Sequence, residues 1–126
     1  MIDLEAFEQL AAREYARLPQ EVRDLTGEVE IRVADAAPLD VLDAMGLDHP
    51  DDLLGLFEGI GLNDASAAPE TGIMPNRIWL YRHAILAHQR EGEDALDAVV
   101  RHVLVHEIGH HFGLSDDEMY AIDDAD

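Results

Sequence analysis

Apolar residues recur at helical spacing near both ends of the chain. Positions 4, 7, 11, 15 and 18 are apolar, which predicts an amphipathic helix with Asp3 as its N-cap and a stop at Pro19. From about Asp94 to Phe112 the chain carries a broad apolar surface, and Gly113 follows it directly. This second pattern predicts a helix that crosses the core and ends at the glycine.

Shorter patterns between these helices predict strands. Residues 28–33 alternate between polar and apolar side chains, which is typical of a half-buried strand. Residues 56–62 favour a strand with irregularities at its glycines. Residues 77–86 are rich in aromatic and β-branched side chains, so they predict the strongest strand of the chain.

The remaining segments are less regular. Residues 38–45 predict a short helix that Gly46 ends, and residues 51–54 are ambiguous. Residues 63–76 are rich in Ala, Ser, Pro, Gly and Asp, so we expect a long loop there. The sequence has no internal repeat, and its length fits one domain over residues 1–126.

The chain is strongly acidic and has no cysteine. Its formal net charge is −20, from 28 acidic and 8 basic residues, so phosphate would be repelled and nucleic acid is not expected as a partner. The same field favours metal ions and basic peptides, although high net charge ordinarily serves solubility. Without cysteine, a metal would have to be held by His, Asp or Glu.

The sequence contains neither a signal-peptide pattern nor a membrane-span pattern. The first residues lack a positive region followed by an apolar one, and no apolar run approaches the roughly 20 residues of a membrane helix. We therefore expect a cytoplasmic protein without a membrane partner.

A metal-binding motif stands near the end of the long predicted helix, at His106-Glu107-Ile108-Gly109-His110. Residues four apart on a helix are neighbours, so the two imidazoles can converge on one zinc ion. Glu107 lies beside them, where a carboxylate can accept a proton from a metal-activated water. The alternative is that these histidines are ordinary helix-surface residues.

A third ligand has to come from beyond the straight helix. Gly113 permits the chain to turn back, and Asp116 then closes a three-ligand site with one position left for water. Asp117 is the rival ligand. Ser115 and Glu118 also form a capping-box pattern, which predicts a short last helix and is compatible with either ligand.

The motif region resembles the metzincin-type metallopeptidases, whose extended pattern H-E-x-x-H-x-x-G-x-x-H ends here with Asp116. Over residues 29–33, 53–59, 77–82 and 106–118 the chain is similar to the minimal zincin-like metallopeptidases of bacteria. The resemblance implies an α+β fold, in which a small mixed sheet packs on an active-site helix and an N-terminal helix. It also implies Zn²⁺ bound by His106, His110 and Asp116, with Glu107 as the base.

Two functions are compatible with these residues. The first is a zinc-dependent hydrolase of peptide bonds, with a peptide or protein substrate bound along an edge strand of the sheet. Residues 77–86 could form that edge strand, and they could equally form an interior strand. The second is a non-catalytic, zinc-stabilised binding module that keeps the form of a peptidase site. The sequence carries no signal for an oligomeric state.

Overall fold

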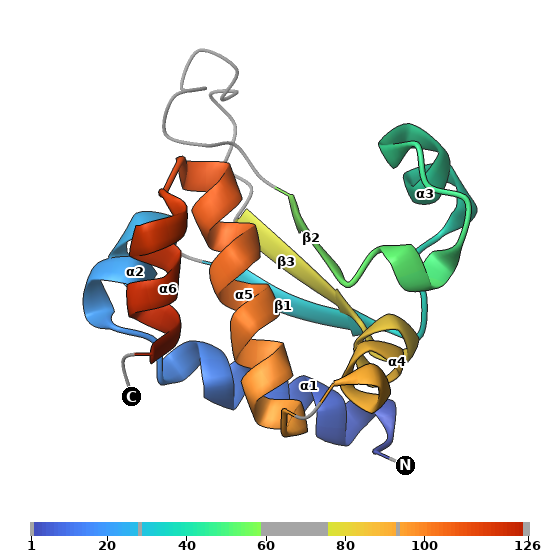
Figure 1. Ribbon diagram of the computed structural model, residues 1–126, viewed down its shortest axis with the longest axis horizontal. Coiled ribbons are helices and arrows are strands. Elements are labelled where there is room, and N and C mark those ends of the chain that lie inside the picture. The colour runs from blue at the N-terminus through green and yellow to red at the C-terminus, as the bar shows by residue number, and fades with distance from the viewer. Residues whose placement is uncertain (1, 28, 59–75, 93, 125–126) are drawn as a thin grey trace.

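The computed structural model describes residues 2–27, 29–58, 76–92 and 94–124, and within them the fold is α+β. A three-stranded sheet lies against a long helix, and further helices surround the pair (Figure 1). The helices are α1 (Leu4–Ala16), α2 (Gln20–Thr26), α3 (Leu39–Met45), the short 3₁₀-helix η1 (Pro50–Asp52), α4 (Arg82–Glu91), α5 (Leu96–Phe112) and α6 (Asp116–Asp124). The strands are β1 (Val29–Ala34), β2 (Gly55–Glu58) and β3 (Asn76–Tyr81).

Strand β3 lies in the middle of the sheet, with β1 parallel on one side and β2 antiparallel on the other. Ile78 is paired with Ile31 of β1 and with Phe57 of β2. Of the two alternatives for the strand predicted over residues 77–86, the interior position is therefore correct. Both sides of β3 are paired, so β3 cannot bind a peptide as an edge strand. Among the described strands, β1 and β2 are the edges.

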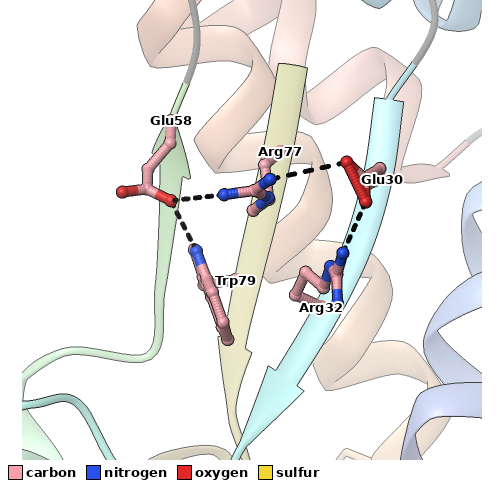
Figure 2. A network of polar contacts seen from close by, with 5 residues as sticks. All are labelled: Glu30, Arg32, Glu58, Arg77 and Trp79. Carbon is pink, nitrogen blue, oxygen red and sulfur yellow. Dashed lines mark hydrogen bonds and ion pairs between the residues drawn. The ribbon is translucent and has the colours of Figure 1, made fainter. Parts of the chain in front are cut away.

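The two faces of the sheet differ in character. Ile78 and Leu80 are completely buried and belong to the same core cluster as the apolar residues of α5. Helix α5 crosses this side of the sheet (Figure 1). The side chains of Arg77 and Trp79 lie on the opposite face, within a polar network that spans all three strands (Figure 2). The core between the sheet, α1 and α5 contains Phe7, Leu10, Ala11, Ile78, Leu80, Ile85, Val99, Val100, Val103, Leu104, Val105 and Ile108.

The predicted ends of the two main helices are confirmed. Asp3 Oδ1 accepts the Ala6 N–H at 2.8 Å, as an N-cap does. Gly113 has φ of 74°, the left-handed conformation that glycine adopts without a steric cost. The Leu114 N–H donates to the Gly109 carbonyl at 2.8 Å and completes the cap, so the chain reverses directly after α5.

The strand predicted over residues 77–86 is wrong in its second half. It ends at Tyr81, and α4 begins at Arg82. The aromatic and β-branched residues that favour a strand are mostly before Tyr81, whereas the following residues include good helix formers. Burial of Ala84 and Ile85 against the fold then favours the helix, and Arg82 pairs with Asp35 at 2.7 Å.

Smaller differences concern the short segments. The first helix ends at Ala16, shortly before the predicted stop at Pro19. Pro19 instead precedes α2, a helix that the sequence pattern did not predict. Of the ambiguous residues 51–54, the first two belong to η1. The strand predicted over residues 56–62 is confirmed for residues 56–58. Residues 59–62 and most of the predicted loop lie outside the described residues. No helix in the described part of the chain is long and apolar enough to span a bilayer.

Candidate active site

Helix α5 brings the residues of the predicted motif to one side of the molecule. Its apolar residues pack into the core, so the intervening polar residues turn outward near its C-terminal end. The ring centroids of His106 and His110 are 5.7 Å apart, with an interplanar angle of 86°. Two rings that each bind one ion at a nitrogen distance of about 2.0–2.1 Å and a tetrahedral angle have centroids about 5 Å apart. The spacing of these two imidazoles therefore fits a shared metal ion.

A cavity of about 260 Å³ opens beside these side chains. One wall belongs to α5 and the other to the segment that joins η1 to β2. Its lining residues are Asp52, Leu53, Leu54, Gly55, His102, Val103, His106, Glu107 and His110.

Gly55 allows the second wall to approach so closely. A Cβ atom at this position would lie 2.8 Å from the Trp79 carbonyl oxygen and 3.0 Å from Cγ1 of Val103. Any other residue would push β2 away from β3 and α5. The glycine thus allows this wall of the cavity to lie close against α5.

Glu107 is a partly buried carboxylate in this cavity. Burial raises its pKa from the ordinary 4.5 to about 7, although a hydrogen bond from the Phe57 backbone N–H acts in the opposite direction. A carboxylate with a pKa near neutrality is suited to accept and return a proton. The N–H of edge strand β2 also fixes the position of the carboxyl group.

His111 has a packing role. Its ring stacks on Phe57 at a centroid distance of 4.1 Å and an interplanar angle of 20°. This contact turns its ring toward β2, although its neighbour His110 lines the cavity. No sequence pattern indicated this contact with a strand so far back in the chain.

His102 also belongs to the cavity wall. Its ring lies 4.1 Å from that of His106, one helical turn away. Its spacing of four residues from His106 is the signal that could have included it in the site. The structure therefore adds one imidazole beside the predicted pair.

The predicted third ligand stands at the start of α6. Ser115 and Glu118 form the predicted capping box, since the Ser115 N–H donates to Glu118 Oε1 at 3.0 Å and the Glu118 N–H donates to Ser115 Oγ at 3.1 Å. The side chains of Asp116 and Asp117 are exposed, and neither lines the cavity. Within residues 2–27, 29–58, 76–92 and 94–124, no three His, Asp or Glu side chains form a group that could hold a metal.

Close packing holds α6 against α5. Met119 is 2% exposed, and a Cβ at Gly109 would overlap its sulfur atom. Met119 is therefore a packing residue, and the absence of a side chain at Gly109 provides the space that its sulfur atom fills. Helix α6 runs back along α5 from the end that carries His110 (Figure 1).

Two tyrosines, Tyr81 at the end of β3 and Tyr120 on α6, lie in different surroundings. Tyr81 is buried, burial raises the pKa of its hydroxyl, and the charges of Glu58 and Glu107 add to the rise. Tyr120 is 59% exposed and lines a different cavity, between α4, α5 and α6. Tyr81 is thus close enough to the site to feel the charge of Glu107.

Comparison with known proteins adds a family to this geometry. No curated protein matches the chain. Among solved structures, a conserved hypothetical protein from Thermo thermophilus is similar with 23% identity and a TM-score of 0.51, over 86% of this chain and 92% of that chain, which shows a shared fold. The zincin-like metallopeptidase family matches residues 26–125, so this chain belongs to that family.

Proposed function

We propose that this protein is a zinc-dependent hydrolase of peptide bonds, with His106, His110 and Asp116 as the metal ligands and Glu107 as the general base. The observation that carries the proposal is the shared cavity of two ligand-spaced imidazoles and a carboxylate whose pKa is about 7. The zincin-like metallopeptidase match supports the same chemistry.

The two histidines are suited to hold a divalent ion without rearrangement of the helix. They come from adjacent turns of α5, and Ile108 between them is completely buried, so the core fixes the helix that carries them. Neutral imidazoles are borderline ligands that suit zinc. A zinc ion bound there would supply Lewis acidity, which polarises a peptide carbonyl and acidifies water.

Glu107 would move the proton. Its carboxylate accepts a proton from the attacking water and returns it to the leaving amine, which is the work of a group with a pKa near neutrality. The Phe57 N–H hydrogen bond orients the carboxyl group toward β2. Edge strand β2 thus supports the base through its backbone.

Asp116 is our choice for the third ligand. The reversal at Gly113 and the capping box at Ser115 bring the first turn of α6 to the end of α5 that carries His110. The site is then completed by a movement of the exposed Asp116 side chain toward the imidazoles. Asp117 is the internal comparison, because it has the same chemistry one position later. D116N should weaken zinc binding at least about tenfold more than D117N, and the reverse order would assign the ligand to Asp117.

The experiment that tests catalysis uses the zinc-loaded chain and a diverse peptide mixture, with cleavage followed by mass spectrometry. The E107Q variant should keep its zinc and lose about 10²–10⁴-fold in turnover, the range that a general base contributes. The matched control is E30Q, a glutamate on the other face of the sheet, which should retain full activity.

Equal turnover by E107Q and the wild-type chain would refute the assignment of the base. A chain that binds zinc, gains stability from it and cleaves nothing would instead be the non-catalytic, zinc-stabilised binding module.

A further inference from the structure

The cavity beside the imidazoles carries negative charge at its mouth. Asp52, at the end of η1, is exposed and contributes to the lining, and Glu107 is the second carboxylate. No arginine lines this cavity, and the chain has no lysine. Asp52 also makes no ion pair with any residue in the described ranges.

The charge of a bound metal does not cancel that of Asp52. A divalent ion held by two neutral imidazoles and one carboxylate, beside the Glu107 carboxylate, leaves the group near neutrality. The charge of Asp52 is additional to this group. With the metal bound, the electrostatic preference of the cavity mouth is therefore set by Asp52.

The wall between Asp52 and the histidines is apolar. Leu53 and Val103 are 8% and 3% exposed, so they form a firm surface, and Leu54 adds to it. A long cationic side chain can lay its methylene stem on such a surface and keep its charged head at the rim. An acidic side chain of similar length would bring two like charges together.

We propose that this cavity is a specificity pocket that selects a lysine or arginine side chain of a peptide, with Asp52 as the specificity-determining residue. The proposal rests on the proposed function, because it assigns a substrate class to the same site. It goes beyond the general acidity of the chain, since it places the preference at one carboxylate.

A binding experiment tests the pocket without turnover. Fluorescein-labelled peptides that differ only in one central Lys, Leu or Glu are titrated, by anisotropy, into the zinc-loaded E107Q chain and into the metal-free chain. The Lys peptide should bind about tenfold more tightly than the Glu peptide, because an attraction replaces a repulsion at a partly exposed site. D52N should reduce this ratio about threefold to fivefold, and D52K should reverse it.

Asp51 provides the matched control. It is the neighbouring exposed aspartate on η1, and it does not line the cavity. D51N changes the net charge as much as D52N does, so it should leave the Lys-to-Glu ratio unchanged. Equal effects of D51N and D52N would show a preference set by overall charge and would overturn the proposal.

Cleavage of the same peptides separates this inference from the proposed function. If the wild-type chain cuts all three peptides at equal rates and D52N changes none of them, the hydrolase stands and the pocket is refuted. If no peptide is cut, yet D52N selectively weakens binding of the Lys peptide, the hydrolase fails and the pocket stands. In the expected result, D52N lowers kcat/KM for the Lys peptide and leaves the Leu peptide unaffected.

Discussion

Two glutamates, Glu30 on the outer face of the sheet and Glu107 on α5, show how surroundings change the behaviour of the same side chain. Glu30 lies on the outer face, where Arg32 donates to it at 2.7 Å and Arg77 lies 3.5 Å away, and these partners lower its pKa (Figure 2). Glu107 lies on the side of α5, where burial raises its pKa to about 7. Cationic partners stabilise the charged form of a carboxyl group and keep its pKa low. A carboxyl group that is partly buried without such partners has a raised pKa and can exchange a proton near neutral pH.

The surroundings of the two glutamates differ in the same way. The outer network continues to Glu58, which lies 3.9 Å from Arg77 and accepts the Trp79 Nε1–H at 2.6 Å. In this network the carboxylates of Glu30 and Glu58 are paired with arginine and indole N–H groups. The inner site places histidines and a carboxylate around open space. The contrast supports the proposal that the chemistry of the molecule takes place on the α5 side.

The largest expected effect is on metal affinity. H106A should weaken zinc binding at least about a hundredfold, because a ligand is lost, as measured by competition with a chromophoric chelator. H83A, which removes an exposed histidine on α4, should leave the affinity unchanged. If both variants bind zinc as well as the wild-type chain, the α5 side has no special role.

The next effect is a pH dependence of stability with opposite signs on the two faces. In the metal-free chain the pKa of Glu107 in the folded state is above its value in the unfolded state. Glu107 therefore leaves the unfolding free energy unchanged below pH 4.5 and lowers it increasingly as the pH rises to about 7. E107Q should therefore gain about 2 kcal/mol of unfolding free energy over the wild-type chain between pH 5 and pH 8, by urea denaturation with a chelator present.

E30Q sharpens that measurement. The pKa of Glu30 is lowered in the folded chain, so its charged form is the stabilising one and is lost as the pH falls. The E30Q variant should lose stability relative to the wild-type chain at pH 8, and the difference should vanish in acid. The same sign for both variants would contradict the contrast between the two faces.

A smaller effect is expected from the packing of α6 on α5. G109A should lower the unfolding free energy by about 1–2 kcal/mol, because the overlap with Met119 outweighs the better helix propensity of alanine. G92A is the control, since a Cβ there would meet only the His88 carbonyl oxygen at 3.7 Å. An unchanged stability of G109A would show that α6 is held loosely.

The smallest effect concerns the outer network. E58Q replaces an exposed carboxylate partner of Arg77 and Trp79, so it should cost less than about 1 kcal/mol and leave zinc affinity unchanged. Trp79 is the single tryptophan of the chain, and its emission should therefore report the change directly. A loss of zinc affinity in E58Q would show that the outer network and the zinc site are coupled, which would contradict the contrast between them.

Local patterns were sufficient for α5 and its end. The apolar spacing, Gly113 and the capping box at Ser115 each concern residues a few positions apart, and such short-range signals predicted these features correctly. The start of α4 was missed because its burial depends on distant segments. The contact of His111 with Phe57 and the approach of Gly55 to Val103 join residues far apart in the chain, which no local pattern records. Convergence of Asp116 on the imidazoles stays a prediction for the same reason.

The sheet order has a consequence for how the chain acquires its structure. Both β1 and β2 pair with β3, and β3 is the last of the three to be synthesised. Neither β1 nor β2 can pair with β3 until residues 76–81 have left the ribosome. The backbone N–H and C=O groups of both strands therefore lack their hydrogen-bond partners in β3 during this part of translation. Such distant pairing slows folding and exposes strand edges in the nascent chain.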